Sequence, residues 1–415
     1  MKNARQYAYE ILQRVILEGG YASLLLRAGR NRFTREDTAL ISEIVYGTIR
    51  RYTLLQYQLK GTVKRKPSPK TEVLLCMGMY QLFFLDRIPV YAVIDETVEL
   101  AGRHEKGFVN AVLRRVSERG LQYCQDEDPD QALAVNTGIP LWLIRMWNSH
   151  YGKETAERIC TNSLEPAAVY GRINPLKISA QKLQEDPKVR MLDAYSFTYD
   201  GLLQETDYFR NGEILIQDKA SAGIPQYLDV QPGMSVYDAC SAPGTKAQMI
   251  AALMQNTGEV IANDDDPDRV RLIDELMQRT GTVNVRTTVS DASVFVPAYE
   301  GYFDRILLDV PCSGLGDLRH KPEIRYHVQP ESLDQITALQ KRILENTCRY
   351  LKKDGILVYS TCTLNRKENE NQIRDFLKGH PEFTLTEERT IFPFEEGTDG
   401  FYCARLIKTG NSMVE

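Results

Sequence analysis

The C-terminal half of the chain contains five apolar runs, each followed at once by an acidic residue or a cysteine, and this repetition constrains the fold most. The first run is "MSVYDACSAPGTK", and the next four end at Asp264, Asp291, Asp309 and Cys362. Stretches with helical periodicity separate the runs. Alternating strands and helices predict a doubly wound parallel sheet, with the polar residues gathered at the carboxyl ends of the strands, where ligands bind.

The first apolar run leads through "DACSAPGTK" into a helix. A strand, a tight turn and a helix start allow a cofactor to approach the backbone closely. Asp264 follows this turn by roughly 20 residues, a spacing suited to a carboxylate that accepts from two ribose hydroxyls. For Asp264, and more so for Asp265 and Asp266, the alternative is a solvated acidic turn. Lys246 lies at the positive end of a helix, which is unfavourable for a cation and indicates an anionic partner.

Cys312 in "DVPCSG" and Cys362 in "YSTCT" both follow predicted strands, so we expect them at one edge of the sheet. Most free cysteines are inert small hydrophobes, but these two lie among loop residues, where reactive groups are common. The eight cysteines form no C-x-x-C pair, so neither zinc nor a disulfide framework is expected and the reducing cytoplasm is favoured. No apolar stretch is long enough to cross a membrane.

The first 125 residues show helical periodicity and are basic. The first 120 residues contain 20 lysines and arginines against 12 acidic residues, whereas the remainder contains 31 against 44. Part of this excess lies in "KGTVKRKPSPK" at 60–70, which is either a contact for a polyanion or a solvated loop. "CQDEDPDQ" at 124–131 resembles a linker, and the short alternating elements that follow it predict a small α+β domain.

Six ordered motifs together resemble the RNA 5-methylcytosine methyltransferases that use S-adenosylmethionine: "DACSAPGTK", "NDDDPDR", "SDAS", "LLDVPCSGLGDLRHKPEIRY", "YSTCTLNRKENENQ" and "DGFYCARLIK". The segments "ISEIVYGTIR" and "GFVNAVLRRV" resemble the NusB-like domain of the bacterial ribosomal RNA small subunit methyltransferase B family. The resemblance implies an all-α NusB-like bundle over 1–125, a small α+β, RRM-like domain within 126–215 and a Rossmann-like methyltransferase domain over 216–415. Thr245 departs from the family, which commonly has glycine there.

The resemblance also implies roles. Cys362 would add to carbon 6 of a cytosine, Asp309 would act as the acid near nitrogen 3, and Cys312 would assist the release of Cys362. The residues alone leave the two thiol roles open, because DNA cytosine methyltransferases use the cysteine of the Pro-Cys motif as nucleophile. The implied cofactor contacts are Cys240, Ser241, Ala242, Pro243, Gly244, Thr245, Lys246, Asp264, Arg269, Asp291 and Asp309.

The implied substrate is a structured RNA, small-subunit 16S rRNA, with a cytosine that can leave its stack. "GDLRHKPEIRY" at 316–326 supplies charge beside Cys312 or is an ordinary surface loop, and "ENENQ" at 368–372 is expected to begin a helix. Two alternatives stay open: the same chemistry on tRNA or another rRNA site, and a non-catalytic RNA-binding assembly or antitermination factor. We expect a cytoplasmic monomer that uses no metal.

Overall fold

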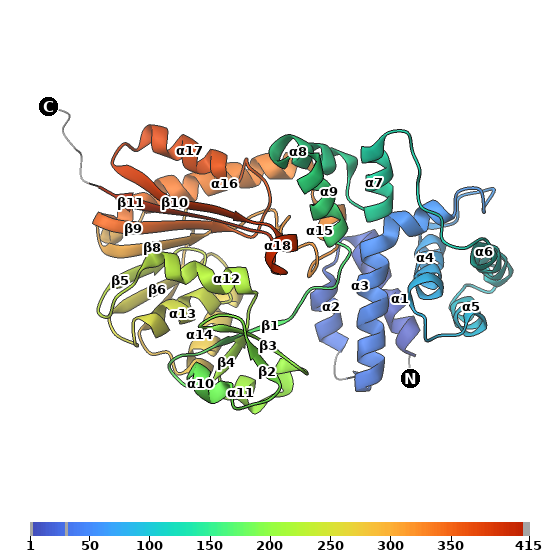
Figure 1. Ribbon diagram of the computed structural model, residues 1–415, viewed down its shortest axis with the longest axis horizontal. Coiled ribbons are helices and arrows are strands. Elements are labelled where there is room, and N and C mark those ends of the chain that lie inside the picture. The colour runs from blue at the N-terminus through green and yellow to red at the C-terminus, as the bar shows by residue number, and fades with distance from the viewer. Residues whose placement is uncertain (1–2, 30–31, 410–415) are drawn as a thin grey trace. The chain divides into compact units, whose positions relative to one another are not determined.

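The computed structural model describes residues 3–29 and 32–409 and contains two compact units (Figure 1). The helical unit consists of Met1–Pro166 together with Leu318–Val328, a segment from far along the chain. The catalytic unit consists of Ala167–Asp317 and Gln329–Glu415. In the part of the chain that is described, no helix is both long enough and apolar enough to cross a bilayer.

Helices make up the first unit, as the periodicity predicts. They are α1 (Ala4–Glu18), α2 (Ala22–Gly29), α3 (Arg35–Gln58), α4 (Pro69–Phe84), α5 (Val90–Glu99), α6 (Lys106–Arg119), α7 (Pro129–Thr137), α8 (Leu141–Tyr151), α9 (Lys153–Asn162) and the short α15 (Ile324–His327).

Local signals in the sequence define the ends of these helices. The side chains of Thr34 and Ser68 accept from backbone N–H groups in the first turns of α3 and α4, which satisfies donors that a helix start leaves unpaired. Gly19 ends α1 in the left-handed region at φ 74°. Ala8, Ile11, Leu12 and Val15 of α1 are buried in the core, which α3, α4 and α6 complete. Lys64, Arg65 and Lys66 stay exposed in a loop without regular structure.

The catalytic unit begins with a small four-stranded antiparallel sheet in the order β2-β3-β1-β4. Its core gathers Ile173, Leu183, Phe197 and Ile214. Its elements are β1 (Tyr170–Ile173), α10 (Ala180–Leu183), β2 (Val189–Met191), β3 (Ser196–Tyr199), α11 (Asp207–Arg210) and β4 (Ile214–Ile216).

A seven-stranded sheet forms the rest of the catalytic unit, in the order β10-β11-β9-β8-β5-β6-β7. The strands are β5 (Ser235–Asp238), β6 (Glu259–Asp264), β7 (Val285–Val289), β8 (Phe303–Asp309), β9 (Leu351–Thr361), β10 (Phe383–Ile391) and β11 (Phe401–Lys408). The helices are α12 (Lys219–Gly223), α13 (Thr245–Leu253), α14 (Pro267–Thr280), α16 (Pro330–Thr347), α17 (Glu370–Gly379) and α18 (Pro393–Glu396).

Helices cover both faces of this sheet (Figure 1). Apolar residues of α13 and α14 pack on one face, against Val236, Val260 and Leu307, and residues of α16 and α17 pack on the other. The strands β5 to β9 are parallel, which confirms the doubly wound arrangement. Their carboxyl ends therefore share one edge, and the residues that end them lie there.

The side of the sheet that the last two strands form differs from the prediction of a parallel sheet. β11 pairs antiparallel with β9, and β10 pairs antiparallel with β11. The connection from β10 to β11 is short and contains only α18, so it reverses the chain direction instead of crossing over the sheet. The predicted domain boundaries at 125 and 215 stay predictions, although α7, α8 and α9 group with the helical unit and the small sheet groups with the catalytic unit.

Candidate active site

The two loop cysteines lie together at the carboxyl edge of the large sheet. The sulfur atoms of Cys312 and Cys362 are 3.3 Å apart, close enough for one thiol to donate to the other. Cys312 follows β8 and Cys362 follows β9, and these are neighbouring parallel strands. The hydrogen bond with Cys362, and then burial, raise the pKa of the Cys312 thiol well above its ordinary value. The geometry thus brings the predicted thiol pair into contact.

Asp309 ends β8 and is held by two partners. Its Oδ2 accepts from Lys246 Nζ at 2.6 Å, and its Oδ1 accepts from the hydroxyl of Ser360 at 2.8 Å. Burial acts to lower the pKa of Lys246, but the charge and hydrogen bond of Asp309 outweigh it, so the pKa is raised. The anionic partner of Lys246 in this structure is therefore a side chain of the same edge.

The loop 241–246, called the cofactor loop below, is held mainly through its backbone. Ser241 N donates to Asn263 O at 2.7 Å, and Gly244 N donates to Ser241 O at 2.7 Å. Gly244 has φ +96°, and a Cβ placed there would lie 2.9 Å from Ile273 Cγ2. A residue other than glycine would strain the turn and push on α14.

Asp264, at the end of β6, is almost fully buried with 2 % of its surface exposed. Its carboxylate accepts from the backbone N–H of Ala242 at 3.2 Å and pairs with Arg269 at 3.1 Å. Burial raises the pKa of Asp264, and the charge of Arg269 opposes this rise. Arg269 also donates to the carbonyl of Ala242 at 3.3 Å, so both residues brace the cofactor loop.

The remaining predicted cofactor residues lie around the same loop or at the next strand. Cys240 directly precedes the loop, and burial raises the pKa of its thiol well above the ordinary value. Pro243 is exposed, and Thr245 begins α13. Asp291 lies just beyond β7, is exposed and accepts from Ser293 N at 2.8 Å.

Asp238 belongs to the same edge, although the sequence alone assigned it no role. It ends β5 and is fully buried. Within the described residues neither carboxylate oxygen has a hydrogen bond of good geometry. Burial raises the pKa of Asp238 to about 7, and the nearby Ser241 hydroxyl partly offsets this rise. An uncompensated buried carboxylate is costly, which marks it as an acceptor for a ligand.

A buried arginine of the small sheet supports the cofactor loop from behind. Arg172 of β1 donates to the carbonyl of Thr245 at 3.1 Å, to Gln248 Oε1 at 2.6 Å and to Gln217 Oε1 at 2.7 Å. Gln248 in turn donates to Asn174 Oδ1 at 2.9 Å. Arg172 and Asn174 both come from "GRINPLK", within the predicted small α+β domain. The sequence did not indicate their role, because their partners lie about 75 residues along the chain.

The segment 318–328 corrects the prediction that all of its charges are available beside Cys312. Arg325 is fully buried in the helical unit and donates to the carbonyls of Arg50, Thr137 and Ser163. Arg319 is 6 % exposed, and its carbonyl accepts from Arg50 at 2.9 Å. The Arg325 guanidinium packs here because several of its N–H donors find carbonyls. Arg319 and Arg325 therefore serve the packing of the helical unit.

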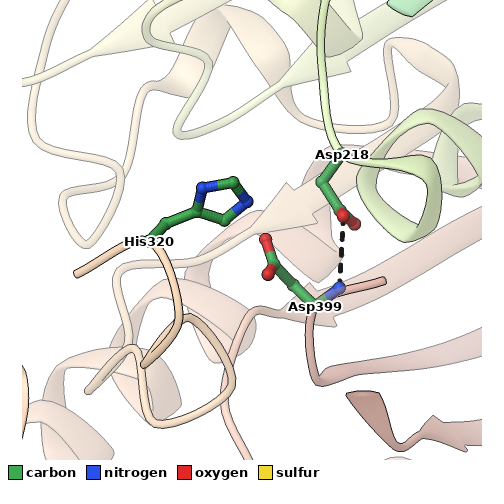
Figure 2. Close-up of side chains that lie close together, drawn as sticks. All are labelled: Asp218, His320 and Asp399. Atoms are coloured by element: carbon green, nitrogen blue, oxygen red, sulfur yellow. Dashed lines mark hydrogen bonds between the residues drawn. The ribbon is translucent and has the colours of Figure 1, made fainter. Parts of the chain in front are cut away.

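The "DGF" motif at 399–401 contacts the residues around both cysteine-containing segments through its backbone. Asp218 accepts from the backbone N–H of Asp399 at 3.1 Å (Figure 2). Gly400 N donates to Gly316 O at 2.9 Å, and Gly316 N donates to Cys362 O at 3.0 Å. A Cβ on Gly316 would lie 1.9 Å from Gly400 O, so the close approach requires glycine.

Three family descriptions match successive parts of the chain. Residues 2–118 match the NusB family, and residues 139–193 match the ferredoxin-like domain of RsmF/B-like methyltransferases. Residues 225–407 match the 16S rRNA methyltransferase RsmB/F family. The match to a ferredoxin-like domain agrees with the predicted small α+β domain.

Full-length relatives agree with this assignment. The probable ribosomal RNA small subunit methyltransferase B of Bacillus subtilis (strain 168) is 35% identical over 98% of this chain and 99% of its own length. The probable ribosomal RNA small subunit methyltransferase B of Synechocystis sp. (strain ATCC 27184 / PCC 6803 / Kazusa) is 30% identical over 98% of this chain and 100% of its own length.

Solved structures share the fold. The crystal structure of a methyltransferase homolog protein from Pyrococcus horikoshii has a TM-score of 0.60 at 28% identity, and covers 68% of this chain and 100% of that chain. The crystal structure of NSun6 from the same organism, with SFG, has a TM-score of 0.59 at 22% identity, and covers 66% of this chain and 99% of that chain. The chain belongs to the ribosomal RNA small subunit methyltransferase B family and is an S-adenosylmethionine-dependent rRNA methyltransferase with a NusB domain, a ferredoxin-like domain and a Rossmann-like catalytic domain.

Proposed function

We propose that the enzyme methylates carbon 5 of a cytosine in 16S rRNA through a covalent bond between Cys362 and the base. The observation that carries this proposal is the contact of two thiols at 3.3 Å, on neighbouring strand ends that also present Asp309. One thiol would suffice for an inert or purely structural role. Two thiols and an acid fit a reaction that must first make and then break a bond to the base.

The chemistry assigns a task to each group. The thiolate of Cys362 adds to carbon 6, which gives carbon 5 the electron density to accept a methyl group, and S-adenosylmethionine supplies that methyl group. The pair of Lys246 and Asp309 holds a proton that can neutralise the charge developing at nitrogen 3. A base then takes the proton from carbon 5, the electron pair re-forms the double bond between carbons 5 and 6, and the bond between carbon 6 and Cys362 breaks to return the thiolate.

The family resemblance assigns the attack to Cys362, since either thiol can donate in the contact between the two. The neighbouring thiol and burial raise the pKa of Cys312. Lys246 interacts with Cys362, so a positive charge lies where a thiolate would form. Cys312 would take part after methyl transfer, when the base must be released.

The residues at the edge of the sheet fit S-adenosylmethionine. Asp238 offers buried carboxylate oxygens without hydrogen bonds of acceptable geometry among the described residues, which suits the amino group of the methionine end. Asp264 would accept from the ribose hydroxyls, Asp291 would accept from the adenine amino group, and the backbone of 240–246 would line the methionine end. Gly244 allows the left-handed turn of this loop, at φ +96°.

The RNA partner and its location complete the proposal. The basic excess in the first 120 residues supports phosphate contacts by the NusB domain, including the exposed loop with Lys64, Arg65 and Lys66. The relatives named as small-subunit rRNA methyltransferases favour 16S rRNA over tRNA. Action in the cytoplasm as a monomer stays a prediction. Bisulfite sequencing of total RNA from a deletion strain should show one 16S rRNA cytosine that loses its methylation.

Trapping the covalent intermediate tests the chemistry. Cys362→Ser should lose all measurable activity and form no adduct, because a hydroxyl does not ionise near neutral pH. Cys312→Ser should still add to the base and transfer the methyl group, and should then accumulate a protein–RNA adduct on a denaturing gel with S-adenosylmethionine. Cys348→Ser, a buried cysteine away from the pair, is the control and should form no stable adduct. An adduct in Cys362→Ser that is absent from Cys312→Ser would reverse the two roles.

A further inference from the structure

Both cysteine loops converge on two adjacent buried residues, Glu368 and Asn369, which precede α17. Both are fully buried, and neither belongs to the catalytic groups described above. The Cys312 loop is defined here as 311–315 and the Cys362 loop as 361–365. The "ENENQ" motif thus begins a helix, as expected, but its first two side chains point to the thiol loops and not to the helix end.

Glu368 holds the Cys312 loop. Its Oε2 accepts from Ser313 N at 2.9 Å and from Gln340 Nε2 at 3.0 Å. Its Oε1 accepts from Ser313 Oγ at 2.5 Å and from Asn365 Nδ2 at 2.9 Å. Gln340 also donates to the carbonyl of Pro311 at 2.9 Å. The residues on both sides of Cys312 are therefore fixed, one by Glu368 directly and the other through Gln340.

Asn369 holds the Cys362 loop in the same manner. Its Oδ1 accepts from the hydroxyl of Thr361 at 2.6 Å, and its Nδ2 donates to the carbonyl of Thr363 at 2.9 Å. These are the two neighbours of Cys362. The hydroxyls of Ser313 and Thr363 are 2.7 Å apart and join the two loops directly. Four flanking residues, two for each cysteine, are thus held from one dipeptide.

The carboxylate of Glu368 adds a charge that an amide could not supply. Four N–H and O–H donors bond to its two oxygens, which is the environment that a buried carboxylate requires. A buried negative charge beside a thiol disfavours the thiolate at that position. The other groups that act on Cys312 are Cys362, the phenol of Tyr359 and the backbone of Gly314, whose hydrogen bond lowers the pKa of Cys312. Lys246 acts on Cys362.

We propose that Glu368 is a positioning residue which holds the Cys312 thiol against Cys362 and, through its buried charge, disfavours a thiolate at Cys312. The negative charge beside Cys312 and the positive charge of Lys246 near Cys362 act in the same direction, and together they favour Cys362 as the attacking group. The proposal deepens the proposed function, since it rests on the assignment of Cys362 as nucleophile. Glu368 itself contacts neither base nor cofactor in this account.

Alkylation of Cys312 by iodoacetamide as a function of pH tests the charge without RNA or S-adenosylmethionine. The rate at Cys312 is followed by peptide mass spectrometry in Cys362→Ala and in Cys362→Ala/Glu368→Gln. Removal of the charge should move the rate profile to lower pH and accelerate alkylation at neutral pH by about 3- to 10-fold. Glu370→Gln in the same background is the matched control, because Glu370 accepts from Thr390 and from neither cysteine loop.

Ser313→Ala separates the tether from the charge. It removes the hydroxyl bonds to Glu368 and to Thr363 and keeps the carboxylate, so the alkylation profile should stay unchanged while kcat falls and the affinity for S-adenosylmethionine is retained. An identical profile with and without Glu368→Gln, in variants that melt normally, would overturn the proposal. If Glu368→Gln does not fold, a normal kcat in Ser313→Ala would overturn it instead. Failure of the covalent mechanism would appear in the adduct experiment and leave the alkylation result standing.

Discussion

The cofactor loop and the two cysteine loops lie on one edge of one sheet but are held in place differently. The cofactor loop depends on backbone hydrogen bonds, on a glycine at φ +96° and on bracing from Asp264 and Arg172. The cysteine loops depend on buried side chains, above all Glu368 and Asn369. In the cofactor loop the backbone itself is held in position, whereas in the cysteine loops the buried side chains fix the positions of the two thiols. We therefore expect substitutions around the cofactor loop to change the affinity for S-adenosylmethionine, and substitutions around the cysteine loops to change the chemical step.

The largest effect on the binding side is expected for Asp264→Ala. Loss of one carboxylate that accepts from two ribose hydroxyls should cost about 1.5–3 kcal/mol, or about 10- to 100-fold in affinity for S-adenosylmethionine. Calorimetric titration of the folded variant measures this. The pH profile of Cys312 alkylation should not change. Asp265→Asn, in the exposed turn beside it, is the control. Unchanged affinity would remove Asp264 from the site.

Arg172→Met tests whether the small sheet supports the cofactor loop. The substitution leaves the buried acceptors of Gln217, Gln248 and Thr245 without their donor, at about 1–3 kcal/mol for each acceptor that stays unpaired. We expect a lower melting temperature and a several-fold weaker affinity for S-adenosylmethionine. Arg190→Met, on an exposed position of β2, should change neither. A destabilised variant with full affinity would show that the cofactor loop holds its shape without the small sheet.

Asp238→Asn should reveal a pH-dependent contribution to stability. Burial raises the pKa of Asp238 to about 7 in the folded state, far above the unfolded value, so the fold prefers the protonated carboxyl. This contribution is fully present below the unfolded pKa, near 4, and is lost as pH rises toward 7. The melting temperature of Asp238→Asn relative to the parent protein should therefore increase between about pH 4 and pH 7 and then level off. A constant difference across this range would show that Asp238 is already ionised in the fold.

The smallest effect is expected from the basic loop, away from both parts of the edge. Each of Lys64→Ala, Arg65→Ala and Lys66→Ala should weaken RNA binding a few-fold and reduce the salt slope by at most about 0.7–0.9. Affinity for S-adenosylmethionine and alkylation of Cys312 should stay constant. Deletion of residues 1–120 would be a less clear test, because Arg325 donates to the carbonyl of Arg50 and would lose this partner. Equal salt slopes in all variants would place the RNA contacts elsewhere.

Local patterns predicted the fold well where the signal is short-range. The helical periodicity of the first 125 residues and the apolar runs that become β5 to β9 are both encoded within a few residues of one another. The antiparallel end of the sheet was not predicted, because an apolar run specifies a strand but not the direction of its partner. Its direction follows from the short connection through α18.

Charge patterns were less informative than strand ends, since burial depends on contacts that the pattern does not contain. Arg319 and Arg325 belong to a basic segment of the kind that contacts nucleic acids, yet both are buried in the helical unit. Lys64, Arg65 and Lys66, which belong to another basic segment, are exposed. Arg325 can be buried because backbone carbonyls surround its guanidinium. These carbonyls come from three distant parts of the chain.

By itself, the sequence determined that Cys312 and Cys362 follow strands and that acids end the other strands, because side-chain type and strand periodicity are local properties. The order of the motifs then determined the family. Only the tertiary structure decided that the two sulfur atoms are 3.3 Å apart, that Asp238 is buried without a full partner and that Glu368 and Asn369 hold both loops. These contacts join residues that are far apart in the chain, since parallel strands bring their ends together only after the helices between them have packed.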